Sequence, residues 1–476
     1  MKLPERFKER TASLLGQDEA EKLFASIESG EAVRAFRINE IKTDLESFEA
    51  SAPRIDREKV NFPPDAYITR ENFPGSLPEH HSGAIYMQDI SAMSTVHAVK
   101  IEKGARVLDS CSAPGGKTTQ LAAAVGEEGI VVANEYDRKR CSILRSNVER
   151  MGAKNTVICN LDTAVLGDTC PRAFDLVLCD APCSGEGMFR KNERAIEEWS
   201  EENLLMCAKR QREILLNVAK CVKVGGKLLY STCTFAIEEN EENVKWFLDT
   251  HTDFQLCEVE NAVRENTSDG LMIEGCEYDM TKCRRIYPHR SMGEGQFIAV
   301  FERVGEETQK ASPRGEADAE RLKRGKKQKG SAQNKRSRAE VDAICAAEQF
   351  LRENLQKIPD GELGILGELI FLSPKIELPP FGVIATGVCV GECQKGRLIP
   401  HHQLFSAYGK DFKLKLELSG SQEECMAYLR GEEIDAVGLD ENASGYCAVI
   451  VDGCAVGGGK VSGGKCKNRY PKGLRE

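Results

Sequence analysis

Between about residue 84 and residue 302, short apolar runs alternate with longer stretches whose apolar residues recur at helical spacing. The runs predict strands at 106–108, 130–133, 156–159, 174–179 and 227–230, and the spacing predicts helices at 117–124, 138–151, 203–222 and 239–249. This alternation predicts an α/β fold, in which a parallel sheet carries helices on both faces. A late apolar run at 296–301 predicts one more strand, added antiparallel.

The flanking segments have other patterns. Residues 1–75 predict a mostly helical start, with helical spacing at 19–29, followed by a loop punctuated by Pro and Gly. Residues 305–340 are polar and nearly free of aliphatic side chains, which is typical of a disordered linker. A helix at 341–354 then precedes apolar runs at 383–390, 448–451 and 457–461, which predict a small β-rich domain. We therefore expect four parts: 1–75, 76–304, 305–340 and 341–476.

Composition narrows the class of protein. Hydrophobic residues make up 41% and charged residues 29% of the chain, as in soluble globular proteins. The apolar runs are too short to cross a bilayer, and residues 1–6 include no apolar run of a secretion signal, so we expect a cytoplasmic protein without membrane contact. The 19 cysteines are odd in number and scattered, with no C-x-x-C pair, which predicts reduced thiols and no metal site.

The formal net charge of −10 argues against broad, non-specific binding to nucleic acid. One basic segment stands out: nine Lys and Arg residues, and no acidic residue, lie between Arg321 and Arg338. Its pattern is equally compatible with a solvated linker and with RNA contact.

The first candidate site follows the strand at 106–108. The residues Cys111-Ser112-Ala113-Pro114-Gly115-Gly116-Lys117 lead from this strand into a helix. Ligands of doubly wound sheets lie across such turns, because glycines allow close backbone approach and the amides at the helix N-terminus receive a carboxylate. A phosphate-binding loop ending in Gly-Lys-Thr is excluded, because it requires a glycine where this chain has Cys111.

The following strand ends present further candidate groups. Glu135, about twenty residues past the glycines, suits the ribose hydroxyls of a ligand, and Asp162 suits its adenine side. The fourth strand ends at Asp180 and Cys183, and the fifth at Cys233. Two cysteines and one aspartate therefore meet at the ligand edge of the predicted sheet, which is not typical of structural burial.

Three runs of sequence resemble the motifs of the RNA cytosine-5 methyltransferases. They are CSAPGGKTTQLAA, DAPCSGEGMFRK and YSTCTFAIEEN, and they match in order and spacing over roughly residues 1–302. The tail runs GECQKGR and KNRYPKGLR resemble the C-terminal region of the bacterial branch that acts on 16S ribosomal RNA. The resemblance implies a Rossmann-like domain that binds S-adenosylmethionine, a helical N-terminal region and a small β-rich, PUA-like C-terminal domain.

The resemblance also implies a role for each matching residue. Residues Cys111 to Lys117 would surround the methionine part of S-adenosylmethionine, Glu135 the ribose and Asp162 the adenine. Asp180 would lie between cofactor and base, Cys233 would be the nucleophile, and Cys183 would help to release the product. Cys111 departs from the family, in which small residues such as alanine are usual, and a third thiol near the cofactor would make oxidative inactivation easier.

The chemistry of cytosine is consistent with these roles. Carbon 5 is too weak a nucleophile to attack a methyl sulfonium, but addition of a thiolate to carbon 6 converts the ring to a reactive enamine. A nearby sulfonium favours the thiolate, and a protonated Asp180 carboxyl is a candidate acid at N3. A base must then remove the proton on carbon 5 before Cys233 can leave.

Several alternatives stay open. Transfer RNA is the main alternative to ribosomal RNA or a small-subunit particle as substrate. A DNA methyltransferase would use Cys183 and leave Cys233 without a role, and the three intact groups argue against a catalytically inactive binding protein. The basic and aromatic residues of the tail suit RNA binding, although a solvated surface would have the same composition: Lys395, Arg397, His401, His402, Lys467, Arg469, Tyr470 and Lys472.

Overall fold

The computed structural model describes residues 2–51, 55–71, 74–305, 337–375 and 381–475. The run between Arg321 and Arg338 lies outside these residues, except for its last two positions. Among the described helices, none combines the length and the apolar character needed to cross a membrane.

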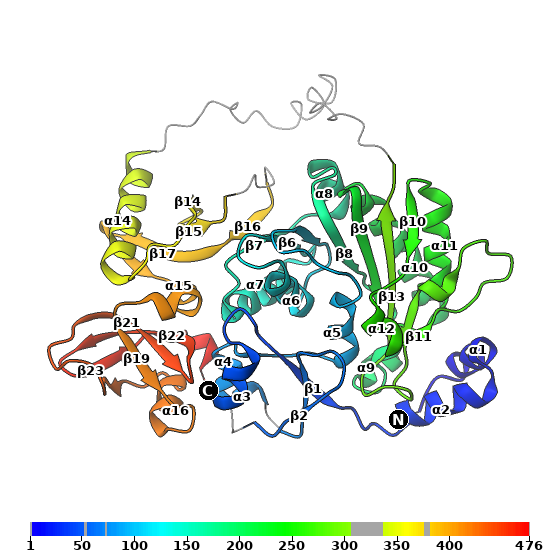
Figure 1. Ribbon diagram of the computed structural model, residues 1–476, viewed down its shortest axis with the longest axis horizontal. Coiled ribbons are helices and arrows are strands. Elements are labelled where there is room, and N and C mark those ends of the chain that lie inside the picture. Colours follow the sequence, from blue (N-terminus) through cyan, green and yellow to red (C-terminus); the bar gives the residue numbers. More distant parts are fainter. Residues whose placement is uncertain (1, 52–54, 72–73, 306–336, 376–380, 476) are drawn as a thin grey trace, which may run out of the picture.

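A ten-stranded sheet forms the centre of the molecule (Figure 1). Its five parallel strands lie in the order β7-β6-β5-β8-β9. Their bounds are Arg106–Asp109 (β5), Ile130–Asn134 (β6), Thr156–Cys159 (β7), Phe174–Asp180 (β8) and Val222–Thr232 (β9). All five were predicted, and β13 (Gln296–Arg303) runs antiparallel to β9 as expected. Beyond it lie β12 (Arg284–Ile286), β11 (Ser268–Asp269) and β10 (Phe254–Cys257).

Helices cover both faces of this sheet, as the alternation predicted. Alternate strand residues point to opposite faces, so the sheet has two separate cores. One core packs against α8 (Thr163–Thr169), α10 (Glu201–Ala219) and α11 (Glu241–Thr250), and the other against α5 (Ile90–Val96), α6 (Gly116–Val125), α7 (Arg138–Met151) and α12 (Asn261–Glu265). Helix α10 ends at Ala219, earlier than the predicted 222, because the buried Val222 already begins strand β9.

The N-terminal region begins with two helices, α1 (Glu5–Leu15) and α2 (Gln17–Glu28), which confirm the predicted helical start. The loop expected after them was wrong. Residues there form a four-stranded sheet in the order β2-β3-β1-β4, together with the short helices α3 (Leu45–Ser51), η1 (Pro74–Ser76) and α4 (Pro78–His81). The strands are Arg34–Ile38 (β1), Glu58–Lys59 (β2), Ala66–Thr69 (β3) and Ile85–Met87 (β4). They are too short to show a clear alternation, and stacked rings of Phe36 and Tyr67 anchor them.

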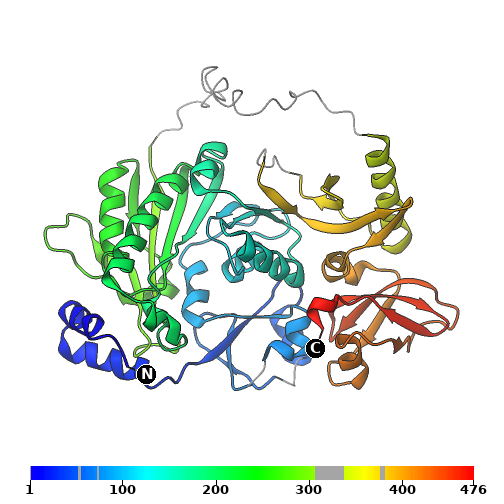
Figure 2. The same cartoon turned by 180° about the vertical axis from the view of Figure 1, so that it is seen from behind.

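The C-terminal part contains two further sheets (Figure 2). Helix α14 (Arg338–Asn354) starts before the predicted 341, because Ser337 and Glu340 form a capping box. It precedes a sheet of β14 (Glu362–Leu366), β15 (Leu369–Ser373), β17 (Val388–Gln394) and β18 (Arg397–Pro400). Helix α15 (His402–Tyr408) leads to a second sheet of β19 (Lys415–Leu418), β20 (Ile434–Asp435), β21 (Gly445–Val451), β22 (Cys454–Ser462) and β23 (Lys465–Asn468). Helix α16 (Glu423–Leu429) lies between β19 and β20 along the chain. One further short helix, α9 (Glu193–Glu197), lies between β8 and α10 along the chain of the central domain.

The predicted strand at 383–390 is two strands that separate at Gly387. The first, β16 (Val383–Thr386), pairs antiparallel with β7 and so belongs to the central sheet. Periodicity could not reveal this, because both halves are apolar and a strand carries no mark of its partner. Three buried residues of the C-terminal part, Phe371, Ala385 and Cys389, complete the core that contains α6 and α7. The C-terminal part therefore shares a core with the central domain.

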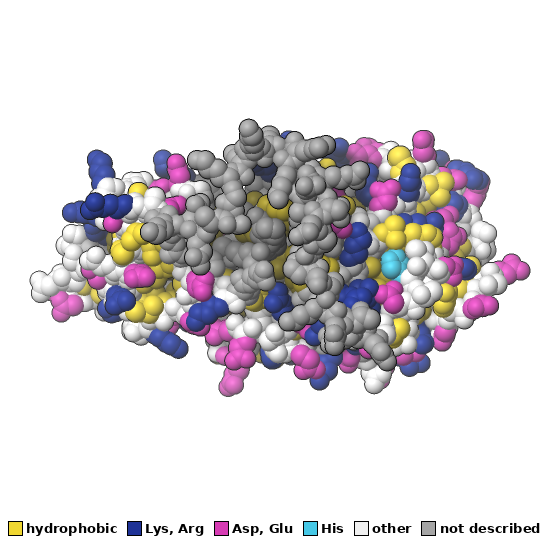
Figure 3. Space-filling view, turned by 90° about the horizontal axis from the view of Figure 1, so that it is seen from above, with side chains coloured by type: hydrophobic (Ala, Val, Ile, Leu, Met, Phe, Trp, Pro, Cys, Tyr) yellow, Lys and Arg dark blue, Asp and Glu magenta, His cyan; other side chains and the backbone are white. Residues whose placement is uncertain are grey.

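The tail residues expected to face RNA differ in exposure. His401 and His402 are half-buried, and five others are exposed: Lys395, Arg397, Lys467, Arg469 and Lys472. Tyr470 is only 2% exposed and its hydroxyl lies 2.8 Å from Nδ1 of His81, so its expected role as an RNA-facing ring was wrong. Seen from above, basic and acidic side chains are interspersed over the described part of this face (Figure 3).

Candidate active site

The turn from β5 into α6 is built for close approach of a ligand. Gly115 has a φ of +111°, a conformation that favours glycine, and a Cβ on Gly116 would lie 3.1 Å from the Gln88 side chain. The turn is tied to the end of β6, because Ser112 N donates to Asn134 O at 2.9 Å. The predicted cofactor residues 111–117 thus form one ordered loop at the carboxyl edge of the sheet.

Glu135 and Asp162 lie at the ends of the next two parallel strands, as predicted. The Glu135 carboxylate is buried and accepts from the amides of Ala113 at 3.3 Å and Asp137 at 2.9 Å. The exposed Asp162 caps α8 by accepting from Ala164 N at 2.8 Å. Between them, Asn160 Nδ2 donates to the carbonyls of Glu135 and Tyr136 at 2.7 and 2.8 Å. A carboxylate accepts well from ribose hydroxyls, so these groups fit the nucleoside half of S-adenosylmethionine.

Asp180 connects the cofactor loop to the strand that carries Cys233. Its Oδ2 lies 2.8 Å from Lys117 Nζ, and its Oδ1 accepts from Ser231 Oγ at 2.6 Å. Lys117 comes from the start of α6 and Ser231 from the end of β9. Asp180 therefore lies between the predicted cofactor loop, which contains Lys117, and the end of β9, which leads to Cys233.

Cys183 and Cys233 lie side by side, with their Sγ atoms 3.2 Å apart. They come from the loops that follow β8 and β9, and both are half-buried. The neighbouring Cys233 thiol, together with burial, holds the pKa of Cys183 well above its usual range. In the same way, the Cys111 thiol and burial raise the pKa of Cys179 well above its usual range. Cys111 is therefore in contact with a second thiol directly beside the cofactor loop.

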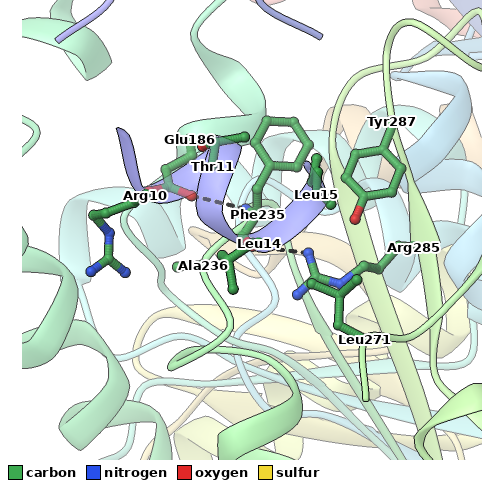
Figure 4. Close-up of a pocket in the computed structure, with 10 residues that line it drawn as sticks. All are labelled: Arg10, Thr11, Leu14, Leu15, Glu186, Phe235, Ala236, Leu271, Arg285 and Tyr287. Atoms are coloured by element: carbon green, nitrogen blue, oxygen red, sulfur yellow. Dashed lines mark hydrogen bonds between the residues drawn. The ribbon is translucent and has the colours of Figure 1, made fainter. Parts of the chain in front are cut away.

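The backbone after Cys233 is held through both polar groups of one residue, Phe235. Phe235 N donates to Glu186 Oε2 at 3.1 Å, and Phe235 O accepts from Arg285 Nη1 at 2.9 Å (Figure 4). Arg285 binds both carboxylate oxygens of the fully buried Glu241. Glu186, Phe235 and Arg285 line a cavity of about 10 Å³, room for about one water molecule, under α1.

The loops also approach each other through their backbones. Gly187 N donates to Cys233 O at 3.0 Å, and a Cβ at Gly187 would lie 2.8 Å from that oxygen. Asn240 accepts from Thr232 Oγ1 at 2.6 Å and donates to Thr234 O at 2.9 Å, so it holds the residues on both sides of Cys233.

Sequence reasoning missed these supporting residues. Three of them lie inside the motif runs quoted above: Glu186, Glu239 and Asn240. The two glutamates are carboxylates close to apolar strand ends, and this position could have marked them as candidates. Arg285 is 50 positions from Phe235, and nothing in its local sequence marks it.

Three family models match separate parts of this chain. A family model described as "16S rRNA methyltransferase RsmB/F" matches residues 96–302. Models of the N-terminal domain of 16S rRNA methyltransferase RsmF and of the methyltransferase RsmF PUA domain match residues 3–90 and 414–476.

Relatives match over most of their length. Ribosomal RNA small subunit methyltransferase F of Vibrio campbellii is 32% identical over 410 residues, which cover 84% of this chain and 81% of the relative. The same enzyme of Aliivibrio fischeri is 31% identical over 457 residues, 93% and 91% of the two chains.

Solved structures share the fold. A methyltransferase homolog protein from Pyrococcus horikoshii is 27% identical, with a TM-score of 0.56 over 63% of this chain and 95% of that one. NSun6 from the same organism, solved with SFG, is 21% identical, with a TM-score of 0.54 over 64% and 99% of the two chains, and shows the fold alone. A Rossmann-like sheet, the ordered cofactor turn and these relatives together show that the chain belongs to the S-adenosylmethionine-dependent 16S rRNA methyltransferases of the RsmB/F family, with the N-terminal and PUA domains of RsmF.

Proposed function

We propose that this protein transfers a methyl group from S-adenosylmethionine to carbon 5 of a cytosine in 16S rRNA, through a covalent bond between Cys233 and carbon 6. The observation that carries the proposal is the pair of thiols 3.2 Å apart, beside Asp180, at the cofactor edge of the sheet. A methyltransferase acting on oxygen, nitrogen or an activated carbon needs no thiol there. Two thiols suit a base that must be attacked and later released.

Each thiol has a distinct task in this mechanism. When bound, S-adenosylmethionine supplies an electrophilic methyl group. Cys233 adds to carbon 6 as a thiolate, which makes carbon 5 nucleophilic. After methyl transfer, the proton on carbon 5 must leave before Cys233 can be eliminated. Cys183, 3.2 Å from Cys233, is the proposed group that assists this release; it can accept the proton only after its own proton has passed to solvent, and its raised pKa then makes the thiolate a strong proton acceptor.

Asp180 is the proposed partner of the base at N3. Its carboxylate now accepts from both Lys117 and Ser231, so a cytosine would have to take over the position of one of them. Lys117 is the better candidate for exchange, because it belongs to the cofactor loop and would turn toward the carboxylate of bound S-adenosylmethionine. The proposed cofactor contacts come from the residues predicted for them: Cys111, Ser112, Ala113, Pro114, Gly115, Gly116, Lys117, Glu135, Asp162 and Asp180.

Ribosomal RNA is favoured over transfer RNA as the substrate. The curated relatives are named for the small ribosomal subunit, and the C-terminal part presents exposed basic side chains, such as Lys395 at the turn between β17 and β18 and Lys467 on β23. The target base must be unpaired or flipped, because carbon 6 is hidden in a stacked helix.

Nucleoside analysis tests the proposal. Purified protein is incubated with methyl-labelled S-adenosylmethionine and one of three RNAs: naked 16S rRNA, assembled small subunits or bulk transfer RNA. We expect label in 5-methylcytidine from one of the two ribosomal substrates. Bisulfite sequencing of RNA from cells with and without the protein locates the position. Label in any other nucleoside would refute the chemistry, and label in transfer RNA alone would refute the substrate.

A further inference from the structure

Two buried glutamates are joined through the loops that carry the two cysteines. Ser184 follows Cys183 and Thr234 follows Cys233, and their hydroxyl oxygens lie 2.9 Å apart. Thr234 Oγ1 donates to Glu186 Oε2 at 3.0 Å, and Ser184 Oγ is in hydrogen-bond contact with Glu239 Oε1. All four side chains are buried. They form a continuous chain, Glu239–Ser184–Thr234–Glu186, which we call the carboxyl chain.

The hydrogen atoms of the carboxyl chain can be counted. Three contacts join its four groups, and each contact needs one hydrogen. Each hydroxyl holds one hydrogen, so Ser184 and Thr234 supply two. If both glutamates were ionised, one contact would bring two oxygens together without a hydrogen between them, which is costly when buried. The third hydrogen must therefore belong to a carboxyl group.

The surrounding donors show which oxygen holds this hydrogen. Glu239 Oε2 accepts from Ser184 N at 3.0 Å and from Gln211 Nε2 at 2.7 Å. Glu186 Oε1 accepts from Trp199 Nε1 at 2.9 Å, and Glu186 Oε2 accepts from Phe235 N at 3.1 Å. A proton on Glu239 Oε2 or on Glu186 Oε1 would face an N–H hydrogen. A proton on Glu186 Oε2 could point toward Thr234, but the protonated oxygen would then be a poor acceptor for Phe235 N. Glu239 Oε1 alone faces only a hydroxyl, which can accept.

We propose that Glu239 is a protonated positioning residue, whose carboxyl donates to Ser184, which donates to Thr234, which donates to Glu186, so that the two cysteine loops are held together. The consequence for methyl transfer rests on the function proposed above, whereas the location of the proton does not. Neither glutamate touches the reacting atoms. They act through Ser184 and Thr234, the immediate neighbours of Cys183 and Cys233.

Burial is consistent with this assignment. Burial raises the pKa of Glu239 to about 7, against the opposing effect of its hydrogen bonds, and burial also raises the pKa of Glu186. Other titratable groups face this pair from each neighbouring element: Cys183 in its own loop, Cys207 on α10, Tyr230 on β9, and Arg10 on α1, itself paired with Glu238. Arg10 is the one cation among them, and it favours an ionised Glu186.

A specific pH dependence follows. Above a pH of about 7, Glu239 loses its proton, and only two hydrogens remain for three contacts. One contact then becomes repulsive, and the cysteine loops are no longer held together. Methyl transfer should therefore fall. Misplacement by about 1 Å lowers rates by about a hundredfold, so the descending limb should span up to about a hundredfold in rate.

The test compares two isosteric variants of the full-length protein. In Glu239→Gln, the amide nitrogen permanently supplies the third hydrogen, while the remaining oxygen accepts from Ser184 N and Gln211. We expect activity at neutral pH to be retained and the descending limb to disappear. In Glu186→Gln, an amide N–H must face Trp199 or Phe235, so activity should fall at all pH values. Glu213→Gln, an exposed position on α10, is the matched control and should behave as wild type.

Infrared difference spectroscopy gives a second readout without catalysis. Subtracting the spectrum of Glu239→Gln from that of the wild type should leave the carbonyl band of one protonated carboxyl below a pH of about 7 and none well above it. The buried Asp109, whose pKa burial also raises to about 7, contributes to both spectra and is removed by the subtraction. A subtracted spectrum without this band would overturn the proposal, even if Glu186→Gln failed to fold. Equal pH profiles for wild type and Glu239→Gln would also overturn it. A product other than 5-methylcytidine, with the infrared result as expected, would refute the proposed function and leave the proton assignment standing.

Discussion

Phe371→Ala tests whether the C-terminal part stabilises the catalytic domain. Phe371 lies on β15, is 1% exposed, and belongs to the core that contains Leu144 and Val148 of α7. Removing a buried Phe side chain costs about 3–5 kcal/mol, from lost burial and from the cavity left behind. Because this core is shared, we expect that loss in the stability of the catalytic domain itself.

The two tryptophans of the chain make the measurement selective. Trp199 packs against Phe7 beside α9, and Trp246 lies on α11, so both report on residues before 305. Urea unfolding followed by tryptophan fluorescence should shift to lower urea in Phe371→Ala. Leu429→Ala removes an equally buried side chain from the separate core of the last sheet and should shift the fluorescence less. An unchanged tryptophan transition in Phe371→Ala would refute the shared core.

Three further changes give distinct outcomes. Arg285→Met leaves the buried Glu241 carboxylate without its partner and should cost about 3–5 kcal/mol, with a large part recovered by adding Glu241→Gln, as measured by a double-mutant cycle in urea. Gly187→Ala should lower the rate of methylation more than it lowers S-adenosylmethionine affinity, because its Cβ would collide with Cys233 O; an unchanged kcat would contradict the close approach. Lys42 is buried among Ser82 O, Ser406 Oγ and Ala455 O, and burial lowers its pKa to about 7. The unfolded state keeps that proton up to a pH of about 10.5, so stability should rise between these pH values, and Lys42→Met should flatten the slope.

The parallel sheet and its site could be predicted because their signals are local. Each strand is a short apolar run, and the predicted site residues lie at a strand end or within a few residues after it, from Cys111 to Cys233. Strand ends of a parallel sheet meet at one edge, so position along the chain was enough to bring them together.

The missed features depend on partners distant in sequence. Strand β16 joins the catalytic sheet by pairing with β7, more than two hundred residues earlier, and its apolar pattern fits any sheet equally well. Tyr470 looks like an exposed ring in a basic tail, yet it is buried against His81. The role of Glu239 became visible only when every donor around its two oxygens was known.

The most direct test of the central claim traps the enzyme on RNA. Cys183→Ala should form the bond from Cys233 to the base but fail to release it, so a labelled 16S rRNA substrate should be retarded on a denaturing gel with S-adenosylmethionine present. Cys183→Ala combined with Cys233→Ala should show no such band, and Cys233→Ala alone should bind S-adenosylmethionine normally without methylating. A retarded band that survives Cys233→Ala, or methylation by that variant, would contradict the account.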